Sequence, residues 1–177
     1  MKDKIVWIPL IVILGIGLFS TLPWTLIYIF GQLEPNPPRP SITYGEFPFR
    51  LEYQINGETK IIEDTLICKF DGYGWNEGIG KHRKWKESLA SGNKEIVLLK
   101  VNENKEIVFP PGNAQFFMGD LKEDYEEYNN DFTSAILVEK IGNGTQSGVI
   151  RAVHLDAEYN IKLISWDYAP PIKNNFK

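Results

Sequence analysis

The residues whose types and spacing could do chemistry lie in residues 71–86, where a glycine-rich stretch is followed by basic and aromatic residues. Glycine-rich loops that end in lysine can bind phosphate. Here Gly80-Lys81 is followed by His82 instead of Ser or Thr, and position 75 is Trp where such a loop needs its first glycine. A dinucleotide-binding pattern fails as well, because Glu77 stands where the third glycine belongs.

This stretch nevertheless contains cations interleaved with aromatic rings. The combination suits anionic lipid headgroups, teichoic-type polymers or stacked sugars, because cations attract phosphate and rings stack on apolar faces. The sequence therefore predicts a ligand-binding surface made of Trp75, Lys81, Arg83, Lys84, Trp85 and Lys86. The alternative is a glycine-rich turn followed by a solvated basic strand whose Trp85 faces the core.

A second charged segment, residues 120–131, is acidic and has a helical or loop-like pattern. Its carboxylates are Asp120, Glu123, Asp124, Glu126, Glu127 and Asp131. They could hold Ca²⁺, but their spacing lacks the alternating ligand order of an EF-hand loop. We favour electrostatic complementarity with the basic strand, within the domain or between copies, and expect no metal and no other cofactor.

Support for hydrolytic chemistry is limited. The two histidines, His82 and His154, belong to no zinc-binding motif, and His154 falls in an alternating segment that predicts a strand. Cys68 is the one cysteine, so no internal disulfide can form, and its strand pattern is typical of a core. No catalytic residue is assigned, and a carboxylate-based envelope hydrolase using Asp71 or Glu77 is the alternative to a binding module.

An uncharged run, residues 5–30, dominates the N-terminal part of the chain. About 20 apolar residues cross a bilayer as a helix, so this run is long enough. Trp7 is expected at the inner interface and Trp24 and Tyr28 at the outer one, because such side chains prefer headgroup depth. Two lysines precede the run, so the N-terminus is expected in the cytoplasm and residues 31–177 outside the plasma membrane. A cleaved signal peptide is the alternative, and the run is long for one.

Four prolines between residues 33 and 40 predict an extended stalk. We therefore divide the chain into a transmembrane signal anchor at residues 1–31, a Pro-rich stalk at 32–40 and one extracytoplasmic β domain at 41–177. The last segment has 16 Lys and Arg against 21 Asp and Glu, a net charge of −5. This balance argues against a nucleic-acid partner, which would need a basic surplus.

Alternating apolar and polar residues predict strands through the third segment. The clearest strand, at 49–55, is followed by Asn56-Gly57, a strong signal for a two-residue hairpin turn, and by a return strand at 59–70 with a bulge or break at Glu63-Asp64. Residues 71–81 are too rich in glycine for regular structure. Further strands are expected at 83–89, 95–101, 106–109, 132–141, 149–155 and 161–168. Seven or eight strands predict a mainly β fold, an antiparallel sandwich or barrel-like domain after the transmembrane helix.

Three stretches of the chain carry a family resemblance: residues 47–53, 63–72 and 76–85. Together they resemble a group of uncharacterised single-pass membrane proteins of Firmicutes-type bacteria, and the likeness spans most of residues 1–110. The resemblance implies a bacterial plasma-membrane protein with an extracytoplasmic β-rich domain. It implies no activity and adds no catalytic residue.

These patterns favour a non-enzymatic binding or interaction module held in the lipid bilayer by residues 5–30. Its expected partner is an envelope polymer or a membrane protein. The alternatives are the hydrolase described above and a structural subunit of a membrane assembly.

Overall fold

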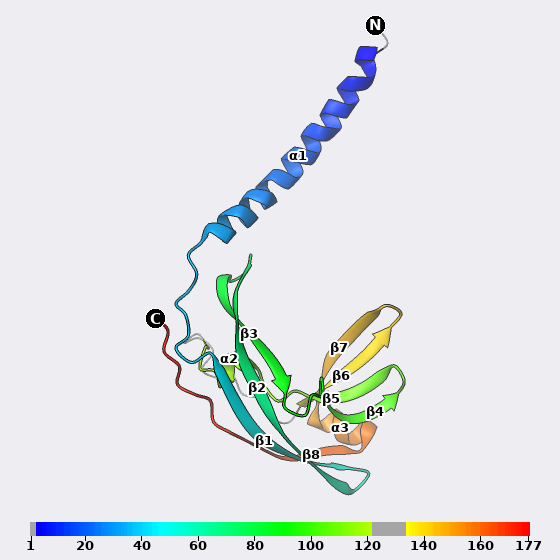
Figure 1. Ribbon diagram of the computed structural model, residues 1–177. Helices are drawn as coiled ribbons and strands as arrows, with labels where there is room; N and C mark the ends of the chain where they lie inside the picture. Colours follow the sequence, from blue (N-terminus) through cyan, green and yellow to red (C-terminus); the bar gives the residue numbers. More distant parts are fainter. Residues whose placement is uncertain (1–2, 122–133) are drawn as a thin grey trace. The chain divides into compact units, whose positions relative to one another are not determined.

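The computed structural model describes residues 3–121 and 134–177, with side chains from residue 12 onward. Helices and strands follow one another along this part of the chain as shown in Figure 1. Their bounds are α1 (Asp3–Leu33), β1 (Tyr44–Ile55), β2 (Glu58–Asn76), β3 (Gly80–Leu89), β4 (Ile96–Asn102), β5 (Lys105–Phe109), α2 (Ala114–Phe117), β6 (Ser134–Ile141), β7 (Gly144–Arg151), α3 (Ala152–Tyr159) and β8 (Ile161–Tyr168).

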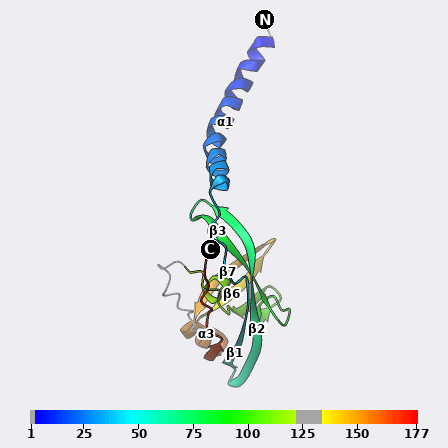
Figure 2. The same ribbon diagram turned by 60° about the vertical axis from the view of Figure 1, so that its left-hand side comes forward.

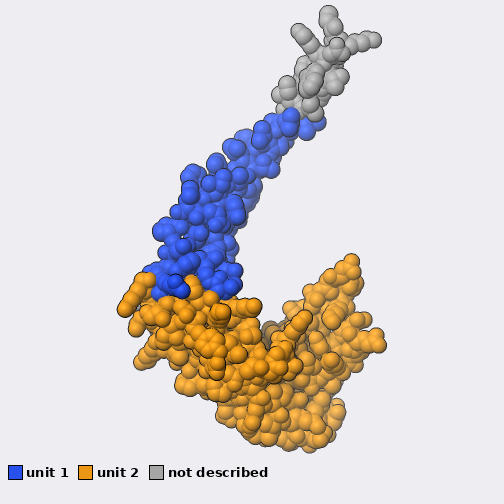
Figure 3. Space-filling view, in the orientation of Figure 1, with its two compact units in different colours: residues 1–39, 71–84 blue, residues 40–70, 85–177 orange. Residues whose placement is uncertain are grey.

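The chain forms two compact units, which Figure 3 colours separately. The first contains Met1–Arg39 together with Asp71–Lys84, and the second contains Pro40–Phe70 together with Trp85–Lys177. Residues 71–84, which the sequence places in the β domain, thus belong to the same compact unit as α1.

The N-terminal helix α1 has the length and composition of a membrane span. Its segment Val12–Leu33 has a mean hydropathy of 1.9, and none of its apolar window is buried. Ser20, Thr21 and Thr25 donate their hydroxyls to carbonyls one turn earlier, at 2.8–2.9 Å. These bonds satisfy the polar groups inside the helix, which lowers the cost of placing them in apolar surroundings. A helix fit for a single-pass anchor is therefore present, as predicted.

The first sheet has the strand order β3-β2-β1-β8. Asn56 and Gly57 have φ values of 51° and 82°, which are the left-handed conformations that a type I′ turn requires. The predicted hairpin between β1 and β2 is confirmed, with Ile55 opposite Glu58 across the turn.

The pairing of β1 with β2 runs from Tyr44 to the turn without a register shift, so the bulge or break expected at Glu63-Asp64 is wrong. Glu63 pairs with Arg50, and its carboxylate lies 3.5 Å from the guanidinium Nε. Two adjacent carboxylates fit a regular strand here because one is ion-paired across the sheet and the other bonds to nearby backbone. A register shift does occur on the other side of β1, between Glu52 and Tyr53, where the partner is β8.

The second sheet has the order β4-β5-β6-β7, in which each strand pairs antiparallel with the next. The predicted hairpin at residues 95–109 is confirmed as β4 and β5. The strand predicted at 149–155 is wrong in its second half, because β7 ends at Arg151 and α3 follows. An eight-residue helix spans little more than two turns, and this one buries a single side chain, Leu155, so the sequence shows no clear helical period.

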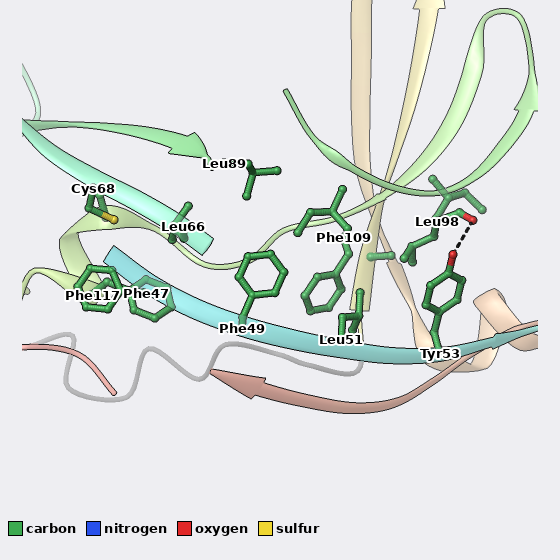
Figure 4. Packing of buried hydrophobic residues seen from close by; sticks show 14 of the residues in the cluster. Phe47, Phe49, Leu51, Tyr53, Leu66, Cys68, Leu89, Leu98, Phe109 and Phe117 are labelled. Atoms are coloured by element: carbon green, nitrogen blue, oxygen red, sulfur yellow. Dashed lines mark hydrogen bonds between the residues drawn. The ribbon is translucent and has the colours of Figure 1, made fainter. Parts of the chain in front are cut away.

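The core of the second unit lies between these two sheets. Phe47, Phe49, Leu51 and Tyr53 alternate along β1 and are all buried. Figure 4 shows the last three on the side of Phe109 and Leu98 of the second sheet, and Phe47 beside Phe117 of α2. The Tyr53 hydroxyl donates to the Leu98 carbonyl of β4 at 3.5 Å and so links the sheets. The fold is the predicted mainly β class, with two antiparallel four-stranded sheets.

Residues 71–81, predicted to be irregular, are mostly strand. β2 continues to Asn76 and β3 begins at Gly80, so only residues 77–79 turn. Gly74 provides space within the strands, because a Cβ there would lie 2.7 Å from Nε2 of His82. Glycine in this stretch therefore reflects close packing as well as turning.

Candidate functional site

The outer half of the β2–β3 hairpin, residues 71–84, packs against the end of α1, and we call it the outer hairpin. Figures 1 and 2 show its turn next to the C-terminal end of the helix. The closest contact joins Trp75 to Gly31, where a Cβ on the glycine would lie 1.9 Å from Cε2 of the indole. The Tyr28 ring meets the same indole edge to face, with 5.8 Å between centroids. Only glycine at position 31 leaves room for this arrangement.

Gln32 and Glu34, at the end of α1, form hydrogen bonds with the first residues of β3. The backbone N–H of Lys81 donates to Oε2 of Glu34 at 3.3 Å, and its Nζ donates to Oε1 of Gln32 at 3.5 Å. Gly80, at φ +67°, lies close to the same carboxylate. The end of the helix and the start of β3 are therefore joined by both packing and hydrogen bonds.

The Pro-rich segment also has a partner in this unit. Nη1 of Arg83 donates to the carbonyl of Pro38 at 3.1 Å. Proline-rich chain has free carbonyls because it has no internal hydrogen bonds, so it readily accepts such a donor. The predicted stalk, residues 32–40, therefore contacts the outer hairpin at Gln32, Glu34 and Pro38.

The turn of the hairpin is ordered by one side chain. Oδ1 of Asn76 accepts hydrogen bonds from the backbone N–H groups of Gly78 and Ile79, both at 3.0 Å. An Asx turn of this kind satisfies backbone donors that would otherwise need water. The turn ends in Ile79, whose side chain is 52% exposed. The turn therefore presents an apolar side chain to the surroundings while the N–H groups of Gly78 and Ile79 are hydrogen-bonded.

The remaining ionic groups of the outer hairpin are partly solvated. Nζ of Lys84 lies 3.3 Å from Oδ2 of Asp71, and both side chains are about half exposed. Nδ1 of His82 lies 3.0 Å from the Gly80 carbonyl, a distance that requires the Nδ1–H tautomer to donate. Glu77 is exposed on the turn. The carboxylates of Asp71 and Glu77, the candidates for hydrolysis, both lack the water-excluded surroundings that carboxylate catalysis needs.

The six predicted ligand residues are divided between the two compact units. Trp75, Lys81, Arg83 and Lys84 belong to the unit of α1, whereas Trp85 and Lys86 belong to the sandwich. Trp85 packs edge to face on Phe70, with 5.5 Å between centroids, and donates to Asp120 at 2.7 Å. The alternative in which Trp85 faces the core is therefore correct for that residue.

Comparison of the chain with protein-family models, curated proteins and solved structures finds no match. The chemistry of the site therefore rests on its own geometry.

Of the predicted membrane-interface residues, Trp24 and Tyr28 have side chains that are 62% and 57% exposed on α1. Trp7 lies in the helix, but its side chain is outside the described part. In the acidic segment, Asp120 is described and is buried beside Trp85, and residues 122–131 lie outside the described residues. The hypothesis of a calcium site there stays untested.

The sandwich has hollows of its own. One of them has a volume of about 590 Å³ and is lined in part by Arg50, Glu63, Asp64 and Asp167. Arg50 is shared between Glu52 and Glu63, at 3.0 and 3.5 Å. The hollow is open to solvent, and Arg50, Glu63 and Asp64 in its lining are engaged in ion pairs or hydrogen bonds.

Asp64 in particular holds the base of the hairpin. Burial raises its pKa, but hydrogen bonds from Ser91, Thr65 and Ala90 outweigh burial, and the net pKa is below its ordinary value. Ser91 donates both its N–H and its hydroxyl to this carboxylate. This carboxylate is a structural acceptor.

The other candidate groups are inert or isolated. Burial, with a smaller contribution from Glu87, raises the pKa of the Cys68 thiol to about 12, so it stays protonated. His154 is exposed on α3, with Nδ1 3.3 Å from the Glu158 carboxylate, and not in the predicted strand. Within residues 3–121 and 134–177, no three His, Cys, Asp or Glu side chains are grouped as metal ligands.

Sequence reasoning missed the helix side of the site, namely Gly31, Gln32 and Glu34. Their partners in the outer hairpin lie more than 40 residues later in the chain. The sequence contained one usable signal: Gly31 follows the apolar run 5–30 directly and precedes the polar residue Gln32. A glycine at that point permits close approach by another chain segment.

Proposed function

We propose that this protein is a single-pass plasma-membrane protein that displays a non-enzymatic binding domain on the extracytoplasmic side. The observation that carries the proposal is the packing of the outer hairpin on the end of α1 through Gly31 and Trp75. Cleavage beyond residue 31 would leave this indole without its packing surface, and cleavage near residue 21 would leave only a short apolar helix behind Tyr28 and Gly31. The contact therefore supports a helix that stays with the domain as its anchor.

The ligand surface is formed by the cations of the outer hairpin. Lys81 and Lys84 are donors with several N–H groups each, of which the described contacts use one. Arg83 adds a planar guanidinium suited to phosphate or carboxylate. Envelope polymers rich in phosphate, or an acidic face of a membrane protein, are the ligand classes that fit these donors.

Topology can be measured by labelling cysteines with a membrane-impermeant maleimide in intact spheroplasts. Asn56→Cys, in the exposed turn between β1 and β2, should react before lysis, and Lys4→Cys should react only after it. Cys68 should stay silent in the parent protein, because its thiol is buried and protonated. Reaction of Asn56→Cys only after lysis would reject the proposed orientation, and a mature N-terminus near residue 21 would reject the anchor.

Binding can be measured by retention of the full-length protein, in detergent, on isolated envelope polymer. The variant with Lys81, Arg83 and Lys84 of the outer hairpin, together with the adjacent Lys86, changed to Gln should lose retention. A matched variant changes Lys94, Lys100, Lys140 and Lys162, which are exposed lysines of the sandwich, and should keep it. Equal retention of both variants would remove the outer hairpin as the ligand surface.

A second candidate function is a subunit of a membrane assembly, favoured by the edge strand β7. Residues 144–150 carry no charge, are almost all exposed, and pair with β6 over eight residues without a register shift. The opposite edge, β4, has two register shifts, which discourage further strand pairing. A regular, uncharged edge can accept another strand.

Site-specific crosslinking in intact cells tests this candidate. A photoreactive residue at Ser147, in the middle of β7, should give a discrete higher-mass product. The same residue at Lys100 of β4 serves as the control. Absence of a product at Ser147, with the protein present at normal levels, would reject assembly through this edge.

A further inference from the structure

The contact between the outer hairpin and α1 lies within the length of the apolar span. The span ends at Leu33, whereas the Trp75 indole meets the ring of Tyr28, five residues earlier. At a helical rise of 1.5 Å per residue, this contact lies about 7.5 Å before the end of the span. A bilayer that takes up the whole span therefore reaches the indole of the hairpin.

Apart from the exposed carboxylate of Glu77 on the turn, the side chains of the hairpin match the layers of such an interface. Ile79 is 52% exposed at the turn, and the indole of Trp75 follows along β2. Lys81 reaches Gln32, at the last residues of the helix, where phosphate groups would lie. Apolar, indole and cationic groups in this order follow the usual gradient from acyl chain to headgroup.

Two backbone amides of the turn also have hydrogen-bond acceptors within the protein, which matters where water is scarce. Unsatisfied amides are costly in the apolar layer of a membrane. The N–H groups of Gly78 and Ile79 are bonded to the side chain of Asn76. The turn can therefore enter the interface without leaving these two donors unpaired.

We propose that residues 76–80 dip into the headgroup layer of the leaflet from which α1 emerges, with Ile79 toward the acyl chains and Lys81 against lipid phosphate. The partner is a phospholipid surface, recognised by a hairpin docked on the anchor. This inference rests on the membrane anchoring proposed above and adds a second point of contact with the bilayer.

The test uses full-length protein in vesicles of phosphatidylethanolamine and phosphatidylglycerol. Ile79→Cys is labelled with an environment-sensitive fluorophore, and the vesicles contain a lipid with a nitroxide on its headgroup. The label should show blue-shifted emission and several-fold stronger quenching than the same label at Asn56→Cys, which lies in the turn between β1 and β2. Cys68 needs no removal, because the unmodified protein reports any labelling of that buried thiol.

Two variants show whether the docked hairpin is responsible. Gly31→Val should displace Trp75 and reduce the quenching at position 79, whereas Gly17→Val, which has open space around its Cα, should not. Lys81→Glu should also reduce the quenching, because it repels phosphate. Equal quenching in Gly31→Val and the parent would overturn the role of the docked hairpin.

Flotation of the vesicles separates this inference from the anchoring proposal. Protein that does not float with lipid would reject the anchor and with it both proposals. Protein that floats but is quenched equally at positions 79 and 56 would reject only the insertion of the turn.

Discussion

The β2–β3 hairpin carries two tryptophans, and their surroundings differ. Trp85 packs on Phe70 in the sandwich, and its indole N–H donates to Asp120. Trp75 packs on Gly31 and Tyr28 of the helix, and its indole nitrogen is buried with no hydrogen-bond partner among the described residues. The inner end of the hairpin thus belongs to a core, while its outer half uses the helix as its packing surface.

This difference predicts that the two ends of the hairpin unfold with different free energies. A buried N–H without an acceptor costs about 1–3 kcal/mol, so Trp75 is held by shape and not by a polar bond. Trp85 has both. Changes around Trp85 should therefore affect unfolding of the sandwich, and changes around Trp75 should affect local opening of residues 71–84.

The largest effect is expected for Trp85→Ala. Truncating a large, fully buried side chain costs about 3–5 kcal/mol, and Trp85 is half-buried against the core, so we expect a loss toward the lower end of that range. The change also removes a donor from Asp120, which is buried. Denaturant unfolding of the full chain in micelles, followed by circular dichroism, measures this loss. Trp75→Ala is the matched change and should leave the same transition almost unaltered; a similar loss in both would contradict the comparison.

A local effect is expected for Gly31→Val. The new side chain cannot fit beside the indole, because even its Cβ would overlap Cε2 of Trp75. A loss of about 1–3 kcal/mol of local stability corresponds to about 5- to 150-fold faster amide exchange in residues 71–84. Hydrogen–deuterium exchange with mass spectrometry reads this directly. Gly17→Val should leave the exchange of these residues unchanged, and if Gly31→Val does so too, the contact is not what orders the outer hairpin.

The base of the hairpin should depend on pH through Asp64. The pKa of this carboxyl is lower in the folded protein, so its contribution to stability is present above its unfolded-state pKa of about 3.9 and is lost as pH falls through the lower folded-state value. Asp64→Asn should cost about 1–2 kcal/mol at neutral pH and flatten the stability profile below pH ~4. Unfolding free energies measured from pH 2 to 7 test this. A variant whose profile keeps the same acid slope would assign that slope to other carboxylates.

The smallest effect is expected for Lys84→Gln. Its ion pair with Asp71 is about half exposed, and exposed pairs contribute about 0.2–1 kcal/mol. Exchange in the outer hairpin should rise by less than in Gly31→Val, and added salt should produce a similar small rise in the parent protein. A change as large as that of Gly31→Val would make charge, and not packing, the main support of the outer hairpin.

Short-range signals predicted much of the fold. Asn56-Gly57 identified the first hairpin, because positive φ at two successive residues is a local property of the backbone. The same reasoning failed at residues 71–81, where glycines allow close packing inside strands. It also failed at α3, whose single buried residue, Leu155, leaves no helical period to detect.

The candidate site was predicted in part. The sequence singled out basic and aromatic residues of 75–86, but it treated Trp75 and Trp85 as members of one surface. The structure places them in different units. Their strand context is similar, so only their distant neighbours, Gly31 for one and Asp120 for the other, distinguish them.

By itself, the sequence determined an apolar helix long enough for a membrane, a mainly β domain after it and a basic, aromatic stretch within that domain's sequence. These follow from composition, periodicity and turn chemistry, which act over a few residues. Only the tertiary structure decided that the stretch folds back on the end of that helix, with Trp75 against Gly31. Contacts between residues more than 40 positions apart depend on shape and packing, and no local pattern encodes them.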